Sequence, residues 1–286
     1  MKSGDFEHRQ VYVVGGSLGI GLAIARRVAA LGSHVTIFAR RAEPLQRAVA
    51  TIRAAQRDPT QNVAARQVDV GDHSQVMEVM HQTAAELGAP GVLINCAGHA
   101  IPRYFEDISY EQFVNTLRVN VHGCWNTIQA VLPHMKPKGG YIVNTASLAG
   151  LIGVFGYTDY CTSKFAVVGF SEALRSELKA FNITVSVLCP PDTDTPGLEA
   201  ENVTKPEETR AIAANARVMT ADAVADALIR GMARRPFLII PGMDGRMSVL
   251  AKRLFPSVVE RVMDRTIRKV AQRRQRGSSR GERESR

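Results

Sequence analysis

Short apolar runs alternate with longer amphipathic stretches along most of this 286-residue chain. The apolar runs lie at 11–16, 34–39, 63–70, 91–98, 140–146, 183–189 and 237–241, and helical patterns lie between them at 19–31, 42–56, 72–87, 109–134, 157–181 and 220–234. Parallel strands need crossover helices that cover both faces of their sheet, so this order predicts a doubly wound α/β architecture. We expect one such domain over residues 1–245, with a seven-stranded parallel sheet.

The composition fits a single domain of this kind. Hydrophobic residues make up 45% of the chain, which is enough for a sizeable core at this length. The N-terminus, MKSGDFEHRQ, has no apolar signal region, and no run of eighteen apolar residues occurs, so we expect a cytoplasmic protein without a membrane span. The four cysteines and seven histidines show no paired or clustered spacing, which argues against a disulfide framework or a metal site.

A glycine-rich turn, GGSLGIG from Gly15 to Gly21, lies between the first apolar run and the first helical pattern. A strand, a glycine turn and a helix N-terminus in this order present backbone N–H groups and a positive dipole end to a pyrophosphate. The sequence therefore predicts a Rossmann-like dinucleotide site. The expected contacts are Gly15, Ser17, Gly19, Ile20 and Gly21.

The end of the second apolar run indicates which dinucleotide is bound. An acidic residue there would accept the ribose 2′-hydroxyl of NAD(H), whereas this chain has Arg40 and Arg41. Two cations suit a 2′-phosphate, and NADPH is therefore the expected cofactor. A solvated loop is the alternative interpretation of the pair.

Ser147, Tyr160 and Lys164 stand in the spacing Ser-x12-Tyr-x3-Lys. The step from Tyr160 to Lys164 places phenol and ammonium on one face of a helix, while Ser147 closes the strand-like run YIVNTAS. A neighbouring ammonium favours the phenolate, so we expect Lys164 to lower the pKa of the Tyr160 phenol from about 10. The three side chains form a candidate acid–base centre.

Together these motifs resemble the short-chain dehydrogenase/reductase family, from Val11 to about Gly242. The resemblance implies that Asn120, in RVNVHG, joins Ser147, Tyr160 and Lys164 in a catalytic tetrad. It also implies further cofactor contacts. These are Asp69, Val70, Asn95, Ala97, Gly98, Tyr160, Lys164, Pro190, Thr193 and Thr195.

A narrower resemblance concerns the stretch PPDTDTPG from Pro190 to Gly197 and the KPEET segment behind it. Both are similar to the 3-ketosphinganine reductases, and the later MDGRMS resembles a segment of the same group. The absence of hydrophobic anchors favours a bacterial-type member. The polar insertion at 196–218 is expected to form a partly helical substrate lid.

The resemblance implies reduction of a ketone to a secondary alcohol by hydride from NADPH. Tyr160 would donate the proton and Lys164 would lower its pKa, while Ser147 would polarise the carbonyl and Asn120 would position a water. The expected substrate is a long-chain 3-keto base with a 2-amino group. Candidate partners for its ammonium are Asp192, Asp194, Glu199 and Glu201, although an acidic exposed lid explains the same residues.

Two other functions stay open. The chain could reduce another lipophilic ketone, such as a 3-oxoacyl thioester or a steroid, or it could bind NADP(H) without turnover. We expect a homo-oligomer. We expect no nucleic-acid partner, because no recognition fold or interleaved aromatic residues accompany the basic charge.

The segment 246–286 carries thirteen Lys and Arg against four Asp and Glu, which equals the net charge of +9 of the whole chain. Its apolar residues recur at helical spacing in two rows: Leu250, Leu254, Val258 and Val262, and Phe255, Val259 and Met263. A basic amphipathic tail, disordered toward its Arg-rich end, suits an anionic membrane surface, so peripheral binding to the cytoplasmic face of a membrane is one expectation. Docking of the apolar rows on the protein body or on a sister subunit is the other.

Overall fold

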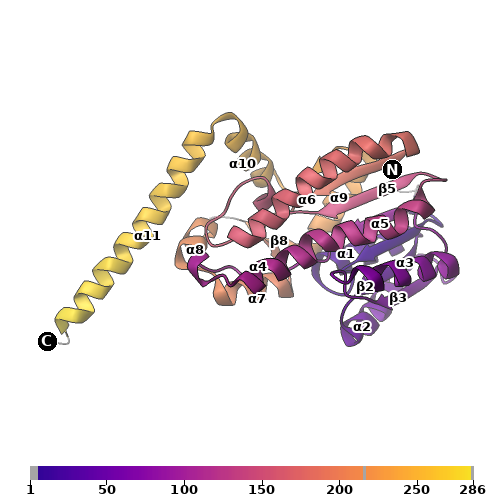
Figure 1. The fold of residues 1–286 in the computed structure, drawn as a ribbon, viewed down its shortest axis with the longest axis horizontal. Helices are drawn as coiled ribbons and strands as arrows, with labels where there is room; N and C mark the ends of the chain where they lie inside the picture. Colours follow the sequence, from indigo (N-terminus) through magenta and orange to yellow (C-terminus); the bar gives the residue numbers. More distant parts are fainter. Residues whose placement is uncertain (1–5, 215–216, 285–286) are drawn as a thin grey trace.

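The computed structural model describes residues 6–214 and 217–284 (Figure 1), with side chains up to Arg273. Residues 215–216 of the expected lid and 285–286 of the tail lie outside this range. Along the described ranges, no helix combines the length and apolar character needed to cross a membrane.

Seven parallel strands form the central sheet, as the sequence predicts, in the order β3-β2-β1-β4-β5-β6-β9. The strands are β1 (Gln10–Val14), β2 (His34–Ala39), β3 (Val63–Gln67), β4 (Val92–Asn95), β5 (Gly140–Thr145), β6 (Ile183–Leu188) and β9 (Leu238–Ile239). The chain builds outward from β1 to β3 and then returns to place β4 on the other side of β1. Ligands of open α/β sheets bind at such a switch point, outside the carboxyl ends of the strands.

Alternate side chains of each strand enter two separate cores. On β1, Val11 and Val13 pack with α1 (Gly19–Ala30), α2 (Ala42–Arg53) and α9 (Ala221–Arg234). Tyr12 and Val14 point the other way and pack with α3 (His73–Leu87), α5 (Gly123–Met135) and α6 (Thr158–Glu177). Both faces of the sheet are therefore covered, which explains why its strands are continuous apolar runs.

A π-helical turn, which the sequence does not predict, interrupts the helical pattern at 109–134. The segment divides into α4 (Tyr110–Leu117), a π-helical turn η3 (Arg118–His122) and α5. A π-turn inserts one extra residue and is frequent at functional sites. Here it contains the fully buried Asn120.

The predicted lid region forms two short helices, α7 (Pro196–Thr204) and α8 (Glu207–Ala213). A two-stranded parallel ladder, between β7 (Thr193–Asp194) and β8 (Met219–Thr220), ties the ends of this region together. Three single-turn 3-10 helices complete the fold: η2 (Phe105–Asp107), η4 (Leu148–Gly150) and η5 (Leu178–Phe181).

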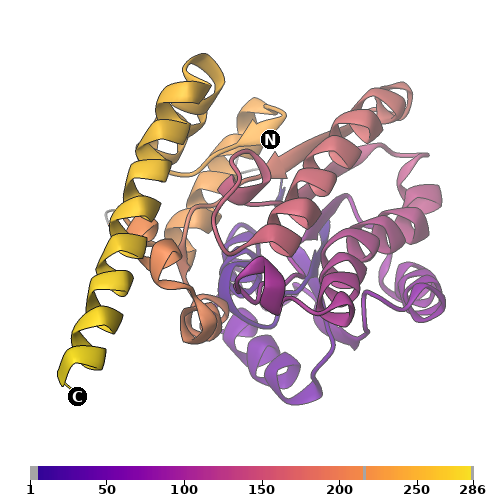
Figure 2. The ribbon, with the colours of Figure 1, turned by 60° about the vertical axis from the view of Figure 1, so that its left-hand side comes forward.

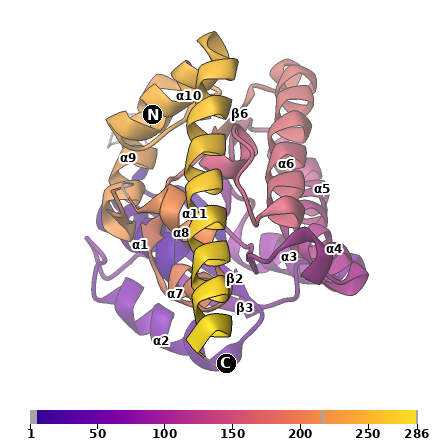
Figure 3. The same cartoon turned by 90° about the vertical axis from the view of Figure 1, so that its left-hand side faces the viewer.

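The C-terminal segment forms α10 (Met243–Leu254) and α11 (Pro256–Glu284), with Pro256 as the first helical residue. The long helix α11 packs against α8 of the lid (Figure 2) and crosses it in Figure 3. The backbone of α11 is helical to Glu284 in the described range, and the disorder expected toward the Arg-rich end stays a prediction.

The two apolar rows of this segment face different environments. Met263 and Val259 are half-buried, and Met263 contributes to a cavity beside α6. Leu250, Leu254 and Phe255 are 47%, 58% and 61% exposed, and Val258 and Val262 continue the exposed row. The row from Leu250 to Val262 therefore lies on the surface, while the other row is half-buried at Val259 and Met263 and exposed at Phe255.

Candidate active site

The predicted site residues gather at the carboxyl edge of the central sheet. The glycine turn follows β1, Asn95 ends β4, Ser147 lies just beyond β5, and Pro190 lies just beyond β6. These four strands are neighbours in the sheet, so their ends meet along one crevice.

Gly15 allows the glycine turn to lie directly against the segment that follows β4. Its φ is +77°, and a Cβ atom there would stand 2.6 Å from the backbone nitrogen of Ala97. Any other residue would push these two segments apart. The turn and the Asn95–Gly98 segment therefore form one continuous wall.

The N-terminus of α1 opens beside this wall. No side chain caps it, and its first turn carries no acidic residue. Its first N–H groups consequently keep their capacity for an anionic ligand, as a pyrophosphate site requires. Ser17 lies in the preceding turn, and Gly19, Ile20 and Gly21 form the first helical residues. These residues fit the dinucleotide that the sequence predicts.

Arg40 and Arg41 are exposed between β2 and α2. Arg40 lies close enough to Asp69 for its charge to act on that carboxyl group. Burial opposes ionisation of Asp69, but hydrogen bonds from the Gly71 amide at 2.9 Å and from Arg118 at 3.1 Å outweigh it, so the pKa of Asp69 is lowered. Asp69 is an ionised acceptor at the expected adenine end of the crevice. Val70 beside it is buried, and its carbonyl accepts a hydrogen bond from Asn126 at 2.9 Å.

Tyr160 and Lys164 lie one turn apart on α6, as their spacing predicts. Lys164 is buried, and its Nζ donates to the carbonyl of Thr145 at 3.0 Å and lies 5.5 Å from the centroid of the Tyr160 ring. The hydroxyl of Ser147 is hydrogen-bonded to Tyr160 and also accepts from the amide of Ala149 at 3.1 Å. The three side chains therefore converge.

Asn120 reaches the same place from the π-turn. Its amide donates to the carbonyl of His99 and to the hydroxyl of Ser163, both at 3.0 Å, and its oxygen accepts from the amide of His99 at 3.0 Å. Gly98 lies between Asn120 and Lys164, since a Cβ there would be 3.1 Å from the Asn120 oxygen and 3.3 Å from the Lys164 ammonium. The four predicted tetrad residues are thus brought together.

The expectation of a lowered pKa for the Tyr160 phenol is wrong. Burial raises the pKa of the Tyr160 phenol above its ordinary value, and the charge of Glu201 raises it further, while the hydrogen bond with Ser147 opposes them. Burial also lowers the pKa of Lys164. The Lys164 ammonium is engaged by Thr145, so dehydration of the phenol dominates.

The remaining predicted cofactor contacts differ in what their side chains do. Asn95 is buried and bonded to Asn144 and Thr127, each at 2.9 Å, so its side chain holds β4 in place. The Thr195 hydroxyl caps α7, accepting from the amide of Leu198 at 3.2 Å, and its methyl lies against Gly19. Thr193 and Pro190 are buried in the same loop, and the carbonyl of Pro190 accepts from Leu148 at 3.1 Å.

The four predicted acidic partners do not share one environment. Asp194 and Glu199 are exposed, and Asp192 forms an ion pair at 3.6 Å with the buried Lys205. Glu201 is half-buried and accepts a hydrogen bond from the hydroxyl of Tyr157 at 2.7 Å. After burial, the charge of Glu201 raises the pKa of Tyr160 more than that of Asp192 does, so Glu201 is the member of this set with the larger effect on Tyr160.

Sequence reasoning missed Tyr157. Its ring centroid lies 5.6 Å from that of Tyr160, and its hydroxyl connects the catalytic helix to the lid through Glu201. Its position three residues before Tyr160, and so on a neighbouring helix face, is the signal that could have identified it. Two further bonds hold the lid down: Thr209 to the carbonyl of Phe155, and Tyr104 to Glu208, both at 2.8 Å.

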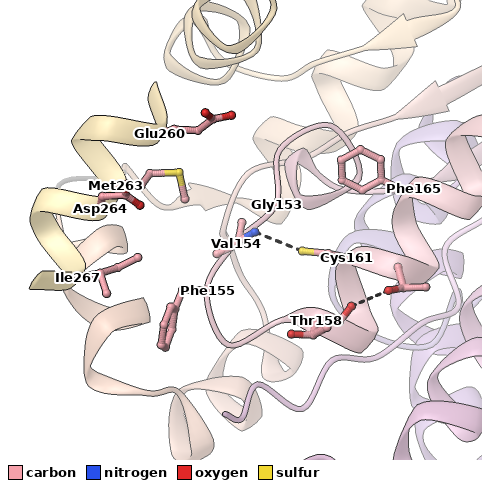
Figure 4. A pocket seen from close by; sticks show the side chains of 11 residues that line it. Gly153, Val154, Phe155, Thr158, Cys161, Phe165, Glu260, Met263, Asp264 and Ile267 are labelled. Carbon is pink, nitrogen blue, oxygen red and sulfur yellow. Dashed lines mark hydrogen bonds between the residues drawn. The ribbon is translucent and has the colours of Figure 1, made fainter. Parts of the chain in front are cut away.

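A cavity of about 600 Å³ lies between the N-terminal part of α6 and α11 (Figure 4). Its wall is mainly apolar, and Val154, Phe155 and Phe165 face Met263 and Ile267 across it. Val154 and Cys161 line the cavity and also pack in one cluster with Tyr157 and Tyr160. The cavity therefore adjoins Tyr160.

Comparison with known proteins agrees with this geometry. The short chain dehydrogenase family matches residues 9–206. The 3-ketodihydrosphingosine reductase of Bos taurus and the 3-dehydrosphinganine reductase of Danio rerio are each 39% identical over 239 residues, 83% of this chain and 72% of the relative. A short chain dehydrogenase/reductase from Burkholderia phymatum, solved in complex with NAD, superposes with a TM-score of 0.77 at 26% identity, over 88% of this chain and 95% of the other. With its sheet order, its glycine turn and its Ser147, Tyr160 and Lys164 centre, this chain belongs to the short-chain dehydrogenase/reductase family.

Proposed function

We propose that the protein reduces the 3-keto group of a long-chain 2-amino ketone, 3-ketodihydrosphingosine, to a hydroxyl with NADPH, in sphingolipid synthesis. The observation that carries the proposal is the convergence of Ser147, Tyr160 and Lys164 beside the dinucleotide crevice. The names of relatives that are 39% identical over most of the chain support this substrate.

Tyr160 is the group proposed to protonate the reduced carbonyl oxygen. A phenol carries its proton at neutral pH, and burial raises the pKa of Tyr160 further. Ser147 would hold that oxygen by a hydrogen bond, and Lys164 would stabilise the phenolate left after proton transfer. NADPH, when bound, supplies the hydride for the carbonyl carbon.

Arg40 is the basis for proposing NADPH. Its exposed guanidinium beside Asp69 is available to a 2′-phosphate on the adenine ribose, and a charge-assisted bond of this kind is stronger than a neutral one. The structural relative from Burkholderia phymatum was solved with NAD, so the choice between the two cofactors needs a direct test.

The cavity beside α6 supports a lipophilic substrate. Its volume of about 600 Å³ falls within the range of about 300–1,000 Å³ that is usual for small-ligand sites. An alkyl chain that leaves the carbonyl at Tyr160 would reach it past Val154 and Cys161. The two threonines in its wall, Thr158 and Thr162, are hydrogen-bonded to each other through the Thr158 carbonyl.

The exposed row on α10 and α11 supports peripheral attachment to an anionic membrane, on the cytoplasmic face. Met243, Met247, Leu250, Leu254 and Phe255 are all between 47% and 67% exposed, and Arg246, Lys252 and Arg253 belong to the same helix. Apolar and basic residues together are what binding at a lipid interface needs. A lipid-metabolising enzyme would thus work at the surface that contains its substrate.

We also propose that the chain forms a homo-oligomer. Trp125 on α5 is 55% exposed and its ring lies 5.6 Å from that of Phe170 on α6, an apolar contact that a second copy would cover.

The proposed reaction is tested by incubating the purified protein with NADPH and 3-ketodihydrosphingosine and measuring the sphinganine formed by mass spectrometry. A 3-oxoacyl thioester and a steroid ketone serve as comparison substrates. Preferred turnover of either would replace the proposed substrate. NADPH binding without oxidation on all three would instead indicate a binding protein.

A further inference from the structure

We infer that Glu201 binds the ammonium group of the substrate and makes the site select 2-amino ketones over neutral ketones of the same length. This inference rests on the proposed function. It assigns to one carboxylate the discrimination between an amino ketone and other lipophilic ketones.

The position of Glu201 is the first argument. It lies in the middle of α7, and its Oε2 atom accepts the hydroxyl of Tyr157 at 2.7 Å. The ring of Tyr157 lies 5.6 Å from the ring of Tyr160, centroid to centroid. The ammonium nitrogen of a 2-amino ketone is attached to the carbon next to the carbonyl. A carbonyl held by Tyr160 therefore places this nitrogen close to the Tyr157–Glu201 pair.

Along the described part of the chain, Glu201 forms no ion pair. Its hydrogen-bond partner Tyr157 is a neutral hydroxyl, and Lys205, whose charge also acts on Glu201, forms its ion pair with Asp192. Asp194 and Glu199 are exposed, so a ligand cation would gain little from them. Of the four predicted acidic partners, Glu201 is the one that combines partial burial with a hydrogen bond to a residue beside Tyr160.

The electrostatics of the catalytic pair give an independent reason. Burial raises the pKa of Glu201, because removing the charged carboxylate from water is unfavourable. After burial, the charge of that carboxylate is the next largest cause that raises the pKa of Tyr160. The same charge opposes the lowering of the Lys164 pKa, with a smaller effect than burial and three cysteines. A substrate ammonium beside Glu201 would cancel this charge. The same contact would therefore bind the substrate and ease proton release from Tyr160.

Selection against neutral ketones follows from the same geometry. A neutral ketone would bury the Glu201 carboxylate further without supplying a cation. Sites built for a polar group reject analogues that lack it, because the buried partner is left unpaired. The Glu201 carboxylate therefore favours binding of an amino ketone and disfavours binding of a neutral ketone.

The test compares Glu201→Gln with Glu199→Gln, a matched change on the exposed face of the same helix. Each variant and the parent are assayed with 3-ketodihydrosphingosine and with its N-acetyl derivative, which has the same chain but no charge. We expect the preference for the amino ketone, as a ratio of kcat/KM values, to fall about 10- to 100-fold in Glu201→Gln, since bonds to charged groups are worth about 1.5–3 kcal/mol. Glu199→Gln should keep the parental ratio.

Tyr157→Phe separates recognition from lid closure. It removes the hydrogen bond to Glu201 but leaves the carboxylate, so the amino preference should persist even if overall activity falls. If Tyr157→Phe and Glu201→Gln each lose the preference for the amino ketone, the inference is overturned in favour of a lid contact. An equal loss of activity on both substrates in Glu201→Gln would overturn it in the same way. A parent enzyme that reduces neither compound would instead overturn the proposed function itself.

Discussion

The ammonium of Lys164 lies 5.5 Å from the centre of the Tyr160 ring, and the pKa of the same phenol is raised by burial and then by the charge of the lid carboxylate Glu201. Lys164 is anchored to the backbone of β5 through the carbonyl of Thr145. The phenol is therefore close to a fixed cation and also responds to an anion that a ligand can neutralise. This arrangement makes the charge on Tyr160 depend on what occupies the site.

Tyr160→Phe should reduce turnover by about 100- to 10,000-fold, because it removes only the proton donor. NADPH binding, followed by fluorescence titration, should be unchanged. Tyr157→Phe, which removes a neighbouring hydroxyl that binds the lid residue Glu201, should lose less activity than Tyr160→Phe. Activity of Tyr160→Phe within about threefold of the parent would exclude the phenol as the donor.

Arg40→Ala should lower kcat/KM for NADPH by about 10- to 100-fold, the value of one hydrogen bond to a charged group. The same parameter measured with NADH should hardly change, because NADH has no 2′-phosphate. Arg41→Ala, at the neighbouring exposed position, tests whether the effect is specific to residue 40. An equal loss with both cofactors would assign Arg40 to support of the fold through its contact with Asp69.

Periodicity was sufficient to predict the sheet and most of its helices. Strands such as Gln10–Val14 and Val92–Asn95 are short apolar runs buried on both faces. This pattern can be recognised in the sequence without knowledge of the tertiary packing. The motifs also identified Ser147, Tyr160 and Lys164, because helix geometry and strand order alone bring them together.

Other features depend on contacts that local pattern cannot encode. The π-turn at Arg118–His122 is stabilised by the bonds of Asn120 to His99 and Ser163, which lie far away in sequence. The raised pKa of Tyr160 results from burial and from the charge of Glu201, so a Tyr–Lys spacing could not predict it. The sequence alone does not distinguish Glu201 from Asp192, Asp194 and Glu199. Its partial burial and its hydrogen bond with Tyr157 make the distinction.

Glu201→Gln should stabilise the protein at neutral pH. Burial raises the pKa of Glu201 in the folded state above its ordinary value of 4.5, so the folded state binds the proton more tightly than the unfolded state. The stability that this provides is complete below pH 4.5 and is lost as pH rises through the folded pKa. Glutamine carries no charge and can still accept the Tyr157 hydroxyl.

The measurement is the melting temperature of parent and variant between pH 4 and pH 8. The advantage of Glu201→Gln should be largest at the upper end and should vanish toward pH 4. Glu199→Gln, whose carboxylate is exposed, should follow the parent at every pH. A constant offset across this range would show that the carboxylate is not buried at a cost. It would also remove the electrostatic support for ammonium recognition.

The last prediction concerns the exposed apolar row on α10 and α11, and point variants test it better than a shortened chain does. Helix α11 packs against α8 of the lid, so a chain ending near Gly245 would lose a packing surface as well as the tail. Leu254 and Phe255 are 58% and 61% exposed, and replacing both with Glu leaves the packed row at Met263 intact.

The full-length protein should sediment with vesicles that contain anionic lipid and should be released as salt shortens the Debye length to about 10 Å or less. It should ignore neutral vesicles. Leu254→Glu with Phe255→Glu should abolish sedimentation, because each removes apolar contact and adds a negative charge, while reduction of a water-soluble ketone continues. Val114→Glu, an equivalent change at an exposed apolar position on α4, should still sediment. If the double variant binds vesicles as well as the parent does, the exposed row is not a membrane contact.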